Sequence, residues 1–433
     1  MTIAPKYYHL LVLGCQMNKN DAERLATILE KIGYQPTDDE SQADLVGVVA
    51  CAVRQSAMDR IHGKVRQWQL EKTKRPLITL LSGCVLQQDR EQLNDKFDIF
   101  LDIKQLDTLP EQLKKLTDEQ LIDLPSYFKI EPKYQSIFSA YVPIATGCNK
   151  FCTYCAVPYT RGKEISRPSS EIIEEVKNLI KRGYKEIILV GQNVNSYGLD
   201  LKDEIKFPAL LQKLDKIQGD WWLRFMTSHP YDMSDDLIKE LGRNKHLTNY
   251  LHLPMQSGDD QILEKMNRHY TIKHYKQLIE KIRKVRPTIG LSTDVIVGFC
   301  GETEEQFQKT LQLFKDVKFD MAYLSQYSTR PGTAAAKLYA DDIPHAIKEK
   351  REFELNEVLG QTGLAYNRQF ESQTVKVLVD SRRKKSDGWR YEGKTSESKT
   401  VTFNAPDLPL IGEFVNVHIT KAKAFGLDGE LVP

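Results

Sequence analysis

Long apolar runs are absent from this sequence. No stretch of the 433 residues reaches the run of about 18 apolar residues that a membrane-spanning helix needs, so we expect no membrane segment. Residues 1–10 hold no basic segment followed by an apolar run, so we expect no secretory signal and a cytoplasmic protein. An excess of one charge is also absent, with 61 Lys and Arg residues against 59 Asp and Glu residues. Any contact with nucleic acid must therefore come from local basic patches.

Cysteine is scarce as well. The chain has seven cysteines, an odd number and a low density that exclude the disulfide framework of a small secreted protein. In a reducing compartment, clustered thiols more often bind metal. Composition also excludes disorder, because 41% of the residues are hydrophobic and 28% are charged. The length predicts about three domains at roughly 150 residues each.

The first region, residues 1–125, is predicted to be an open parallel α/β sheet. Near-continuous apolar segments, typical of strands buried on both faces, alternate with helical spacing. Strand candidates lie at residues 8–14, 45–49, 76–81 and 98–103, and helix candidates lie at 21–31 and from about 55 onward. Residues 121–135 hold two prolines and little periodicity, which predicts a linker.

The middle region, residues 136–369, repeats the α/β pattern. Its strand candidates are residues 141–146, 186–191, 222–227, 250–254, 290–297 and 320–327. Helical segments separate them, and a long amphipathic segment at residues 345–369 ends the region. Six βα units joined by right-handed crossovers predict a partial (β/α)6 barrel.

The last region, residues 371–433, is predicted to be a small all-β barrel. Short strand candidates at residues 374–380, 390–394, 400–404 and 414–420 are separated by turns. The basic run Arg382-Arg383-Lys384-Lys385 follows the first of them and is a candidate contact for RNA backbone, with a solvated turn as the alternative. Residues 388–395 (GWRYEGKT) formally match a phosphate-binding loop. That loop needs a preceding buried strand and a following helix, so we exclude nucleotide triphosphate binding.

Three cysteines that are far apart in the sequence share one context. Cys15, Cys51 and Cys84 each follow a predicted strand of the first region. The carboxyl ends of parallel strands lie at one edge of a sheet, where ligands bind in open α/β folds. We therefore expect these three thiols to converge at one point. The alternative is three separate buried cysteines that act as small hydrophobic residues.

The other set of three cysteines is compact. Cys148, Cys152 and Cys155 have C-x3-C-x2-C spacing directly after the predicted strand 141–146. Three thiolates on one short loop can hold three irons of a [4Fe–4S] cluster and leave the fourth iron open. A zinc site would need a fourth Cys or His within a few residues, and the loop offers none. Cys300 stands alone beside a predicted turn, and we expect it not to be a ligand.

Residues 147–155 (GCNKFCTYC) resemble the signature of radical S-adenosylmethionine (SAM) enzymes. With the three N-terminal cysteines and the β tail, nearly the whole chain resembles the methylthiotransferase family of these enzymes. The segments PYTRGKEISRPS, GQNVNSYG, TSHP, HLPMQSG and VGFCGETEEQF are similar to its tRNA-modifying branch, and YEGKT and VTFN resemble a TRAM RNA-binding module. Two positions depart from the family pattern: Val49-Ala50 stands where Asn-Thr is usual, and Cys300 stands where Pro is usual.

The resemblance implies a transferase with two [4Fe–4S] clusters and SAM as cofactors. Cys148, Cys152 and Cys155 would hold the SAM cluster, and Cys15, Cys51 and Cys84 would hold an auxiliary cluster. One SAM would provide a 5′-deoxyadenosyl radical and another a methyl group. The product would be the 2-methylthio derivative of N6-isopentenyladenosine at position 37 of tRNA. The alternative substrates are N6-threonylcarbamoyladenosine at the same position and an aspartate of a ribosomal protein.

The resemblance also implies partners and site residues. The partners are the tRNA anticodon stem-loop and a reducing electron donor such as flavodoxin or ferredoxin, and we expect a monomer. Barrel sites form at the carboxyl ends of strands, where the SAM pocket should lie. The candidates for SAM binding are Tyr154, Gly191, Gln192, Asn193, Ser228, Gln256 and Asp294. The candidates for RNA phosphate or the SAM carboxylate are Arg161, Lys163 and Arg167.

Two functions from other classes compete with this interpretation. A two-cluster electron-transfer protein would have ligands close together in the sequence and no RNA module, so the scattered first set and the β tail oppose it. An RNA-binding protein with vestigial clusters would be expected to lack ligands, and all six are present.

Overall fold

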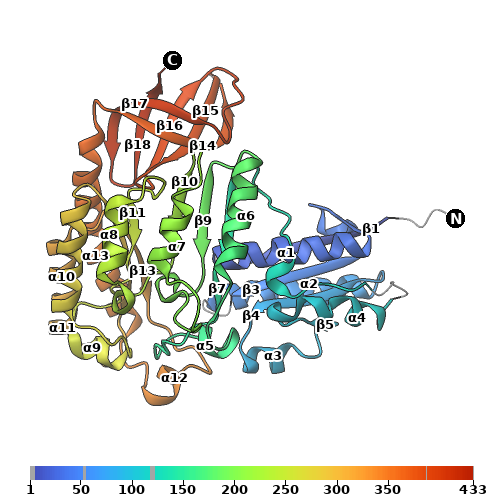
Figure 1. Cartoon of the computed structure of the whole chain (residues 1–433). Coiled ribbons are helices and arrows are strands. Elements are labelled where there is room, and N and C mark those ends of the chain that lie inside the picture. The colour runs from blue at the N-terminus through green and yellow to red at the C-terminus, as the bar shows by residue number, and fades with distance from the viewer. Residues whose placement is uncertain (1–4, 52–54, 118–121, 387, 433) are drawn as a thin grey trace. The chain divides into compact units, whose positions relative to one another are not determined.

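The computed structural model describes residues 5–51, 55–117, 122–386 and 388–432 (Figure 1). The chain divides into two compact units. The N-terminal unit comprises Met1–Ser136, Thr146–Arg167 and Arg330–Lys337, and the barrel unit comprises Ile137–Ala145, Pro168–Thr329 and Leu338–Pro433. The loop with Cys148, Cys152 and Cys155 therefore groups with the N-terminal sheet, although it follows that sheet in the sequence.

A five-stranded parallel sheet forms the centre of the N-terminal unit. The strand order is β2-β1-β3-β4-β5, and all neighbours are parallel. The strands are β1 (Lys6–Val12), β2 (Tyr34–Pro36), β3 (Leu45–Cys51), β4 (Ile78–Cys84) and β5 (Ile99–Phe100). The helices are α1 (Gln16–Ile32), α2 (Gln55–Lys72), α3 (Gln87–Leu93), α4 (Leu109–Lys114) and the short α5 (Val157–Thr160). The predicted open parallel sheet is confirmed.

Side chains of β3 explain why this sheet needs a layer on both faces. Every residue of β3 is buried, and its sequence LVGVVAC contains no polar side chain other than the terminal thiol. Val46 and Val48 pack in one core with Ile61 and Trp68 of α2. The helix α1 begins at Gln16, earlier than the predicted start at residue 21. The prediction missed the first turns because the side chains that they bury include the polar Asn18, Asn20 and Asp21.

The centre of the barrel unit is a set of six parallel strands in two three-stranded groups, β10-β9-β6 and β11-β12-β13. A parallel bridge between Leu223 and Leu247 connects the groups, which gives the predicted partial barrel. The strands are β6 (Ser139–Pro143), β9 (Glu186–Val190), β10 (Trp222–Phe225), β11 (Tyr250–His252), β12 (Gly290–Val297) and β13 (Met321–Gln326). Two short strands, β7 (Ala145–Thr146) and β8 (Ile165–Ser166), pair with each other.

Helices alternate with these strands, as the sequence predicts. They are α6 (Ser169–Lys181), α7 (Phe207–Leu214), α8 (Asp235–Arg243), α9 (Asp260–Lys265), α10 (Ile272–Val285), α11 (Glu304–Val317) and α13 (His345–Asn367). The short helix α12 (Ala334–Leu338) belongs almost entirely to the N-terminal unit. Local signals set their starts: Ser234 accepts from the Leu237 amide, and Thr303 and Gln306 form a reciprocal capping box. None of the helices in the described part of the chain is long and apolar enough to cross a membrane.

The C-terminal strands close into the predicted small barrel, in the order β14-β15-β16-β18-β17. They are β14 (Thr374–Lys385), β15 (Gly388–Thr395), β16 (Thr400–Ala405), β17 (Phe414–Lys423) and β18 (Gly426–Leu431). Val377, Tyr391, Phe403 and Val417 are among the side chains in its core. Two predictions were incomplete: β14 continues beyond Asp380 through the basic run, and β18 was not predicted.

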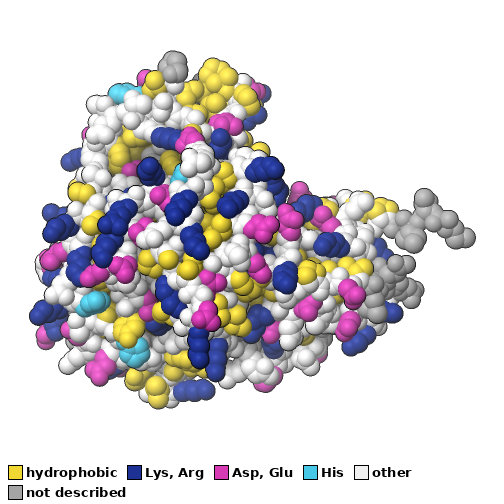
Figure 2. Space-filling model, viewed as in Figure 1, with side chains coloured by type: hydrophobic (Ala, Val, Ile, Leu, Met, Phe, Trp, Pro, Cys, Tyr) yellow, Lys and Arg dark blue, Asp and Glu magenta, His cyan; other side chains and the backbone are white. Residues whose placement is uncertain are grey.

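The loop between β15 and β16 binds to the amino ends of the larger barrel's strands. Lys399 forms a buried ion pair with Asp320, which directly precedes β13. Arg224 of β10 donates to the carbonyls of Thr395 at 2.8 Å and Ser396 at 3.1 Å. This loop therefore joins the small barrel to the partial barrel by buried charged contacts. Elsewhere, Lys and Arg side chains are interspersed with Asp and Glu on the face drawn in Figure 2, in keeping with the balanced composition.

Candidate functional site

The carboxyl ends of β3 and β4 place two predicted ligands side by side. Cys51 and Cys84 are the last residues of these neighbouring strands and are direct partners in the register. Gly14 lies against Cys51, since a Cβ on Gly14 would be 2.6 Å from the Cβ of Cys51. Cys15 follows Gly14 and, with Cys51, lies close enough to Cys84 to raise the pKa of its thiol. These three sheet-edge cysteines (Cys15, Cys51 and Cys84) therefore meet at one edge of the sheet.

Glycines allow this close approach. Gly14 and Gly83 directly precede sheet-edge cysteines and have φ of 132° and 95°. A Cβ on Gly83 would be 2.5 Å from the carbonyl oxygen of Ala50, so this position excludes a side chain. Gly147 precedes Cys148 and repeats the pattern, with φ of 82° and only 2.0 Å between its hypothetical Cβ and the Lys163 carbonyl oxygen. The Gly-Cys pairs were a signal in the sequence that its analysis missed.

A buried polar network surrounds the sheet-edge cysteines. The side-chain amide of Asn18 donates to the carbonyls of Leu13 at 3.0 Å and Ala50 at 2.6 Å, so it ties two strand ends together. Arg161 donates from Nε to the Cys84 Sγ at 2.9 Å and from Nη2 to the Asn18 Oδ1 at 3.3 Å. Arg161 also forms an ion pair with Asp21. Asn18 and Asp21 were not among the predicted site residues.

Arg161 was predicted to contact RNA phosphate or the SAM carboxylate, and its burial opposes the first of these. A contact with RNA phosphate needs a guanidinium at the surface, but Arg161 is only 1% exposed. The physical reason is its ion pair with Asp21, because a buried guanidinium is tolerated when an opposite charge and hydrogen-bond acceptors surround it. The structure therefore gives Arg161 a place beside Cys84 rather than on an RNA-binding surface.

The donor set at the sheet edge suits an iron–sulfur cluster. Burial raises the pKa of the Cys84 thiol to about 11, while the Arg161 charge acts in the opposite direction. A thiolate at this position therefore needs positive charge close by, which iron ions would supply in addition to Arg161. Three sulfur donors without an oxygen ligand are the set that such clusters use.

The loop cysteines (Cys148, Cys152 and Cys155) lie on a turn with its own backbone bonds. The Cys148 amide donates to the Gly162 carbonyl at 3.1 Å, and the Cys155 amide donates to the Cys152 carbonyl at 2.9 Å. Burial raises the pKa of the Cys148 thiol to about 11. Tyr154, the predicted adenine contact, is half-buried on the same turn.

A single-ion site is not formed by either set. Within the residues that the structure describes, no three His, Cys, Asp or Glu side chains are placed to hold one metal ion. This finding leaves the cluster prediction in place, because a [4Fe–4S] cluster has four irons for its thiolates rather than one shared ion.

Three predicted SAM-binding residues carry buried polar atoms without a hydrogen-bond partner. They are the Asn193 Oδ1, the Ser228 Oγ and the Gln256 Oε1, which follow the carboxyl ends of β9, β10 and β11. Buried polar atoms are nearly always bonded, so three such atoms at successive strand ends indicate a polar ligand. The residues of this end of the barrel unit therefore fit a small polar cofactor such as SAM.

The remaining SAM candidates lie at the same ends of the strands. The Gly191 carbonyl accepts from the Thr227 hydroxyl at 2.6 Å, and the Gln192 side chain is half-buried. Asp294 of β12 accepts at Oδ2 from the His252 ring, with 3.3 Å between the two atoms. His252 is buried and was not among the predicted site residues. Its position on β11 beside Asp294 depends on strand register, which the sequence does not give.

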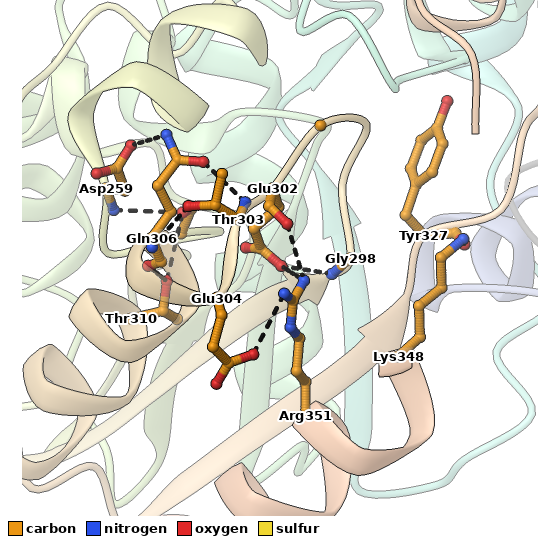
Figure 3. Close-up of polar contacts among 12 residues, drawn as sticks. Asp259, Gly298, Glu302, Thr303, Glu304, Gln306, Thr310, Tyr327, Lys348 and Arg351 are labelled. Carbon is orange, nitrogen blue, oxygen red and sulfur yellow. Dashed lines mark hydrogen bonds and ion pairs between the residues drawn. The ribbon is translucent and has the colours of Figure 1, made fainter. Parts of the chain in front are cut away.

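A buried charge network supports the loop after β12. Arg351 of α13 donates from Nη1 to the Glu302 Oε2 at 2.9 Å, and the Gly298 amide donates to the same oxygen at 2.8 Å (Figure 3). The carboxylate of Glu304 also lies 3.4 Å from Arg351. Burial raises the pKa of Glu302 to about 7. Cys300 is 3% exposed inside this turn.

The other RNA candidates divide into exposed and buried residues. Lys163 is exposed, but Arg167 is 5% exposed, and its guanidinium lies over the Phe128 ring at 5.9 Å from the centroid. The structure therefore places Arg167, like Arg161, away from the solvent that an RNA contact needs.

The basic run is exposed and lies on the extension of β14, where it pairs with β15. The run does not form the turn that was the alternative to an RNA contact, because cross-strand pairing continues to Lys385 and Gly388. Arg382 stacks on Trp389 at 4.3 Å from the ring centroid and forms an ion pair with Asp407. Arg383, Lys384 and Lys385 follow it along the strand.

Comparisons with known proteins agree with this arrangement. Residues 142–314 match the radical SAM superfamily, residues 7–102 match the uncharacterized protein family UPF0004, and residues 368–432 match the TRAM domain. A tRNA-2-methylthio-N(6)-dimethylallyladenosine synthase of Clostridium novyi (strain NT) is 41% identical over 440 residues, covering 99% of this chain and 97% of the relative. The enzyme of the same name from Thermoanaerobacter sp. (strain X514) is 43% identical over 439 residues, covering 98% and 93%.

The chain belongs to the tRNA-2-methylthio-N(6)-dimethylallyladenosine synthase family. Members of this family are radical SAM transferases, so the predicted enzyme class and the predicted family are confirmed. A solved structure of the radical SAM methyltransferase TsrM from Kitasatospora setae has a TM-score of 0.56 at 13% identity, with 77% of each chain covered. That likeness supports the fold alone.

Proposed function

We propose that this chain is a radical SAM transferase that converts N6-isopentenyladenosine at position 37 of tRNA to its 2-methylthio derivative. The observation that carries the proposal is the match of nearly the whole chain to relatives named for this activity, at 41% and 43% identity. The two cysteine sets and the unpartnered atoms at the strand ends supply sites for the cofactors that such an activity needs.

The proposal gives each region a part. Residues 1–125 carry the sheet-edge cysteines for an auxiliary [4Fe–4S] cluster, and residues 136–369 carry the loop cysteines for the SAM cluster. Residues 371–433 bind RNA. When bound, the clusters and SAM supply the radical, the sulfur and the methyl group, chemistry that side chains cannot provide. The substrate is the tRNA anticodon stem-loop, the electron donor is a flavodoxin or ferredoxin, and the protein acts in the cytoplasm as a monomer.

The chain's own residues bind and orient these groups. The thiolates hold the clusters. Asn193, Ser228 and Gln256 offer buried polar atoms to the SAM molecule at the carboxyl ends of the strands, with Asp294 held beside them by His252. Tyr154, on the turn of the loop cysteines, would contact the adenine of SAM. Lys163 and the basic run are exposed and so remain the candidates for RNA backbone.

The test is nucleoside mass spectrometry of tRNA from cells that lack their own methylthiotransferases, with and without this protein. We expect 2-methylthio-N6-isopentenyladenosine to appear with the parent chain and to be absent with a Cys148→Ala variant as the matched control. Methylthiolation of N6-threonylcarbamoyladenosine instead would contradict the proposed substrate. Absence of any methylthio nucleoside from cells that contain the iron-loaded parent would contradict the proposed function.

A further inference from the structure

Arg161 connects the segment that carries the loop cysteines with the sheet-edge cysteines. It directly follows α5, and its amide donates to the Val157 carbonyl at 2.8 Å. Its side chain is 1% exposed, and its Nε lies 2.9 Å from the Cys84 Sγ. A guanidinium keeps its charge in proteins, so a permanent positive charge lies in direct contact with one sheet-edge sulfur.

Three buried groups fix the direction of this guanidinium. Asp21 pairs with its Nη2, and Asn18 accepts from the same nitrogen at 3.3 Å. Asp21 itself accepts from the Tyr127 hydroxyl at 2.5 Å. Because Asn18 also bonds to the strand ends at Leu13 and Ala50, the guanidinium is held by the framework that holds the cysteines. Its contact with Cys84 is therefore set by packed neighbours and not by an exposed, flexible chain.

A charge and a hydrogen bond at a ligand sulfur have a defined effect on an iron–sulfur cluster. Hydrogen bonds to the sulfurs and the net charge nearby are among the factors that set the reduction potential. The reduced cluster carries one more negative charge than the oxidised cluster, so a nearby cation stabilises it. Outer groups that bond to a ligand also orient that ligand.

We propose that Arg161 is a positioning residue for the auxiliary cluster, which orients the Cys84 thiolate and raises the cluster's reduction potential. This inference rests on the proposed function, because it takes the sheet-edge cysteines as cluster ligands. It goes further by giving a residue of the loop-cysteine segment a defined part at the other cluster. It also explains why a cation is buried at a site where no substrate phosphate can reach it.

The test uses the full chain with Cys148, Cys152 and Cys155 replaced by Ala, so that only the auxiliary cluster contributes a signal. Redox titration followed by electron paramagnetic resonance gives the midpoint potential. In an Arg161→Gln variant we expect the ratio of reduced to oxidised cluster at a fixed potential to fall about tenfold, which equals about 59 mV for one electron. In an Asp21→Asn variant we expect a shift of the opposite sign and smaller size, because the carboxylate lies behind the guanidinium.

Two further variants separate a charge effect from a structural one. Arg75 is another arginine of this unit; it is half-buried before the amino end of β4 and bonds to the Ala43 carbonyl before β3 at 2.6 Å. An Arg75→Gln substitution lies at the opposite ends of the strands from the cysteines and should leave the potential unchanged. An Arg161→Lys variant keeps the charge and should give a potential between those of the parent and Arg161→Gln. If the Arg161→Gln variant does not hold a cluster, the potential of the Arg161→Lys variant is the test.

An unchanged potential in the iron-loaded Arg161→Gln variant would overturn the inference. Shifts of the same sign in the Arg161→Gln and Asp21→Asn variants would also overturn it, because they would reflect a general loss of structure. The proposed function fails in a different way: the starting variant with intact Arg161 would then contain no iron bound through the sheet-edge cysteines.

Discussion

Glu302 should make the stability of the barrel unit depend on pH. Its carboxylate is buried after β12, and its pKa is raised from 4.5 to about 7, chiefly because burial disfavours the charged form. Between these two values the folded chain holds a proton that the unfolded chain has released. The free energy of unfolding should therefore fall as the pH rises from 4.5 to about 7, and stay level above it.

The size of the effect follows from the same values. A change of one in pKa is worth about 1.4 kcal/mol, so the rise to about 7 corresponds to about 3 kcal/mol across this range. With a urea m value of about 3 kcal/mol/M, the midpoint of unfolding should move by about 1 M. The measurement is urea unfolding of the full-length chain, followed by tryptophan fluorescence at pH values from 5 to 8.

Substitutions at two neighbouring carboxylates make the test specific. A Glu302→Gln variant should lose the decline in midpoint between pH 5 and 7. Glu304 contacts the same Arg351 but is largely exposed, and hydrogen bonding to Gln308 is the main cause of its lowered pKa. The stabilisation from Glu304 is lost only at pH values below the pKa of this carboxyl in the unfolded chain. A Glu304→Gln variant should therefore keep the parent's decline in urea midpoint between pH 5 and 7. A Glu302→Gln variant with the parent's decline would refute this account of the buried carboxylate.

Three more predictions concern the cofactors and RNA. Anaerobically reconstituted protein should hold about eight irons per chain, four for each cluster. Replacing either cysteine set with Ala should remove about half of this iron. An unchanged iron content in the variant without the sheet-edge cysteines would exclude the auxiliary cluster. The variant without sheet-edge cysteines should still cleave SAM to 5′-deoxyadenosine but form no methylthio product, because each set has its own ligands; methylthiolated tRNA from it would refute this division. Replacing the basic run with Ala should weaken stem-loop binding and make the slope of log affinity against log salt shallower, because a protein with fewer phosphate contacts releases fewer counterions when it binds. An equal slope for parent and variant would show that the run does not contact RNA.

Much of the fold could be predicted because its strands are buried on both faces. Residues 45–49 form a strand in the structure as the sequence predicts, since a parallel strand between layers of helices has few polar side chains and LVGVV has none. Residues 290–297 also form a strand as predicted, although Ser292, Thr293 and Asp294 are polar. The strand β18 was missed because GLDGEL has two glycines and no regular alternation of apolar residues. The extension of β14 was missed for a related reason: its last residues are charged and exposed, and pairing with β15 alone holds them in a strand.

The candidate site was predictable to a different extent. The positions of the cysteines after strands indicated where the thiols would lie, because strand ends in a parallel sheet share one edge. The position of Arg161 could not be predicted, because a basic residue after a cysteine loop has the same sequence signal whether it faces solvent or a buried Asp21. The sequence signal that indicates this buried site is the polar residues in the first turns of α1. Helical spacing there brings Asn18 and Asp21 to the buried side, where apolar residues are the rule.

The contacts of the loop between β15 and β16 limit how RNA binding by the small C-terminal barrel can be tested. Deleting residues 371–433 would remove Lys399 and leave the buried carboxylate of Asp320 without its cation. The Arg224 guanidinium would also lose two of its carbonyl acceptors. An unpaired buried charge costs roughly 3–5 kcal/mol, so the truncated chain would suffer a stability defect in the partial barrel itself. Loss of activity after such a deletion would therefore say little about RNA binding. Surface substitutions on β14 are the better way to separate a loss of RNA binding from a loss of stability.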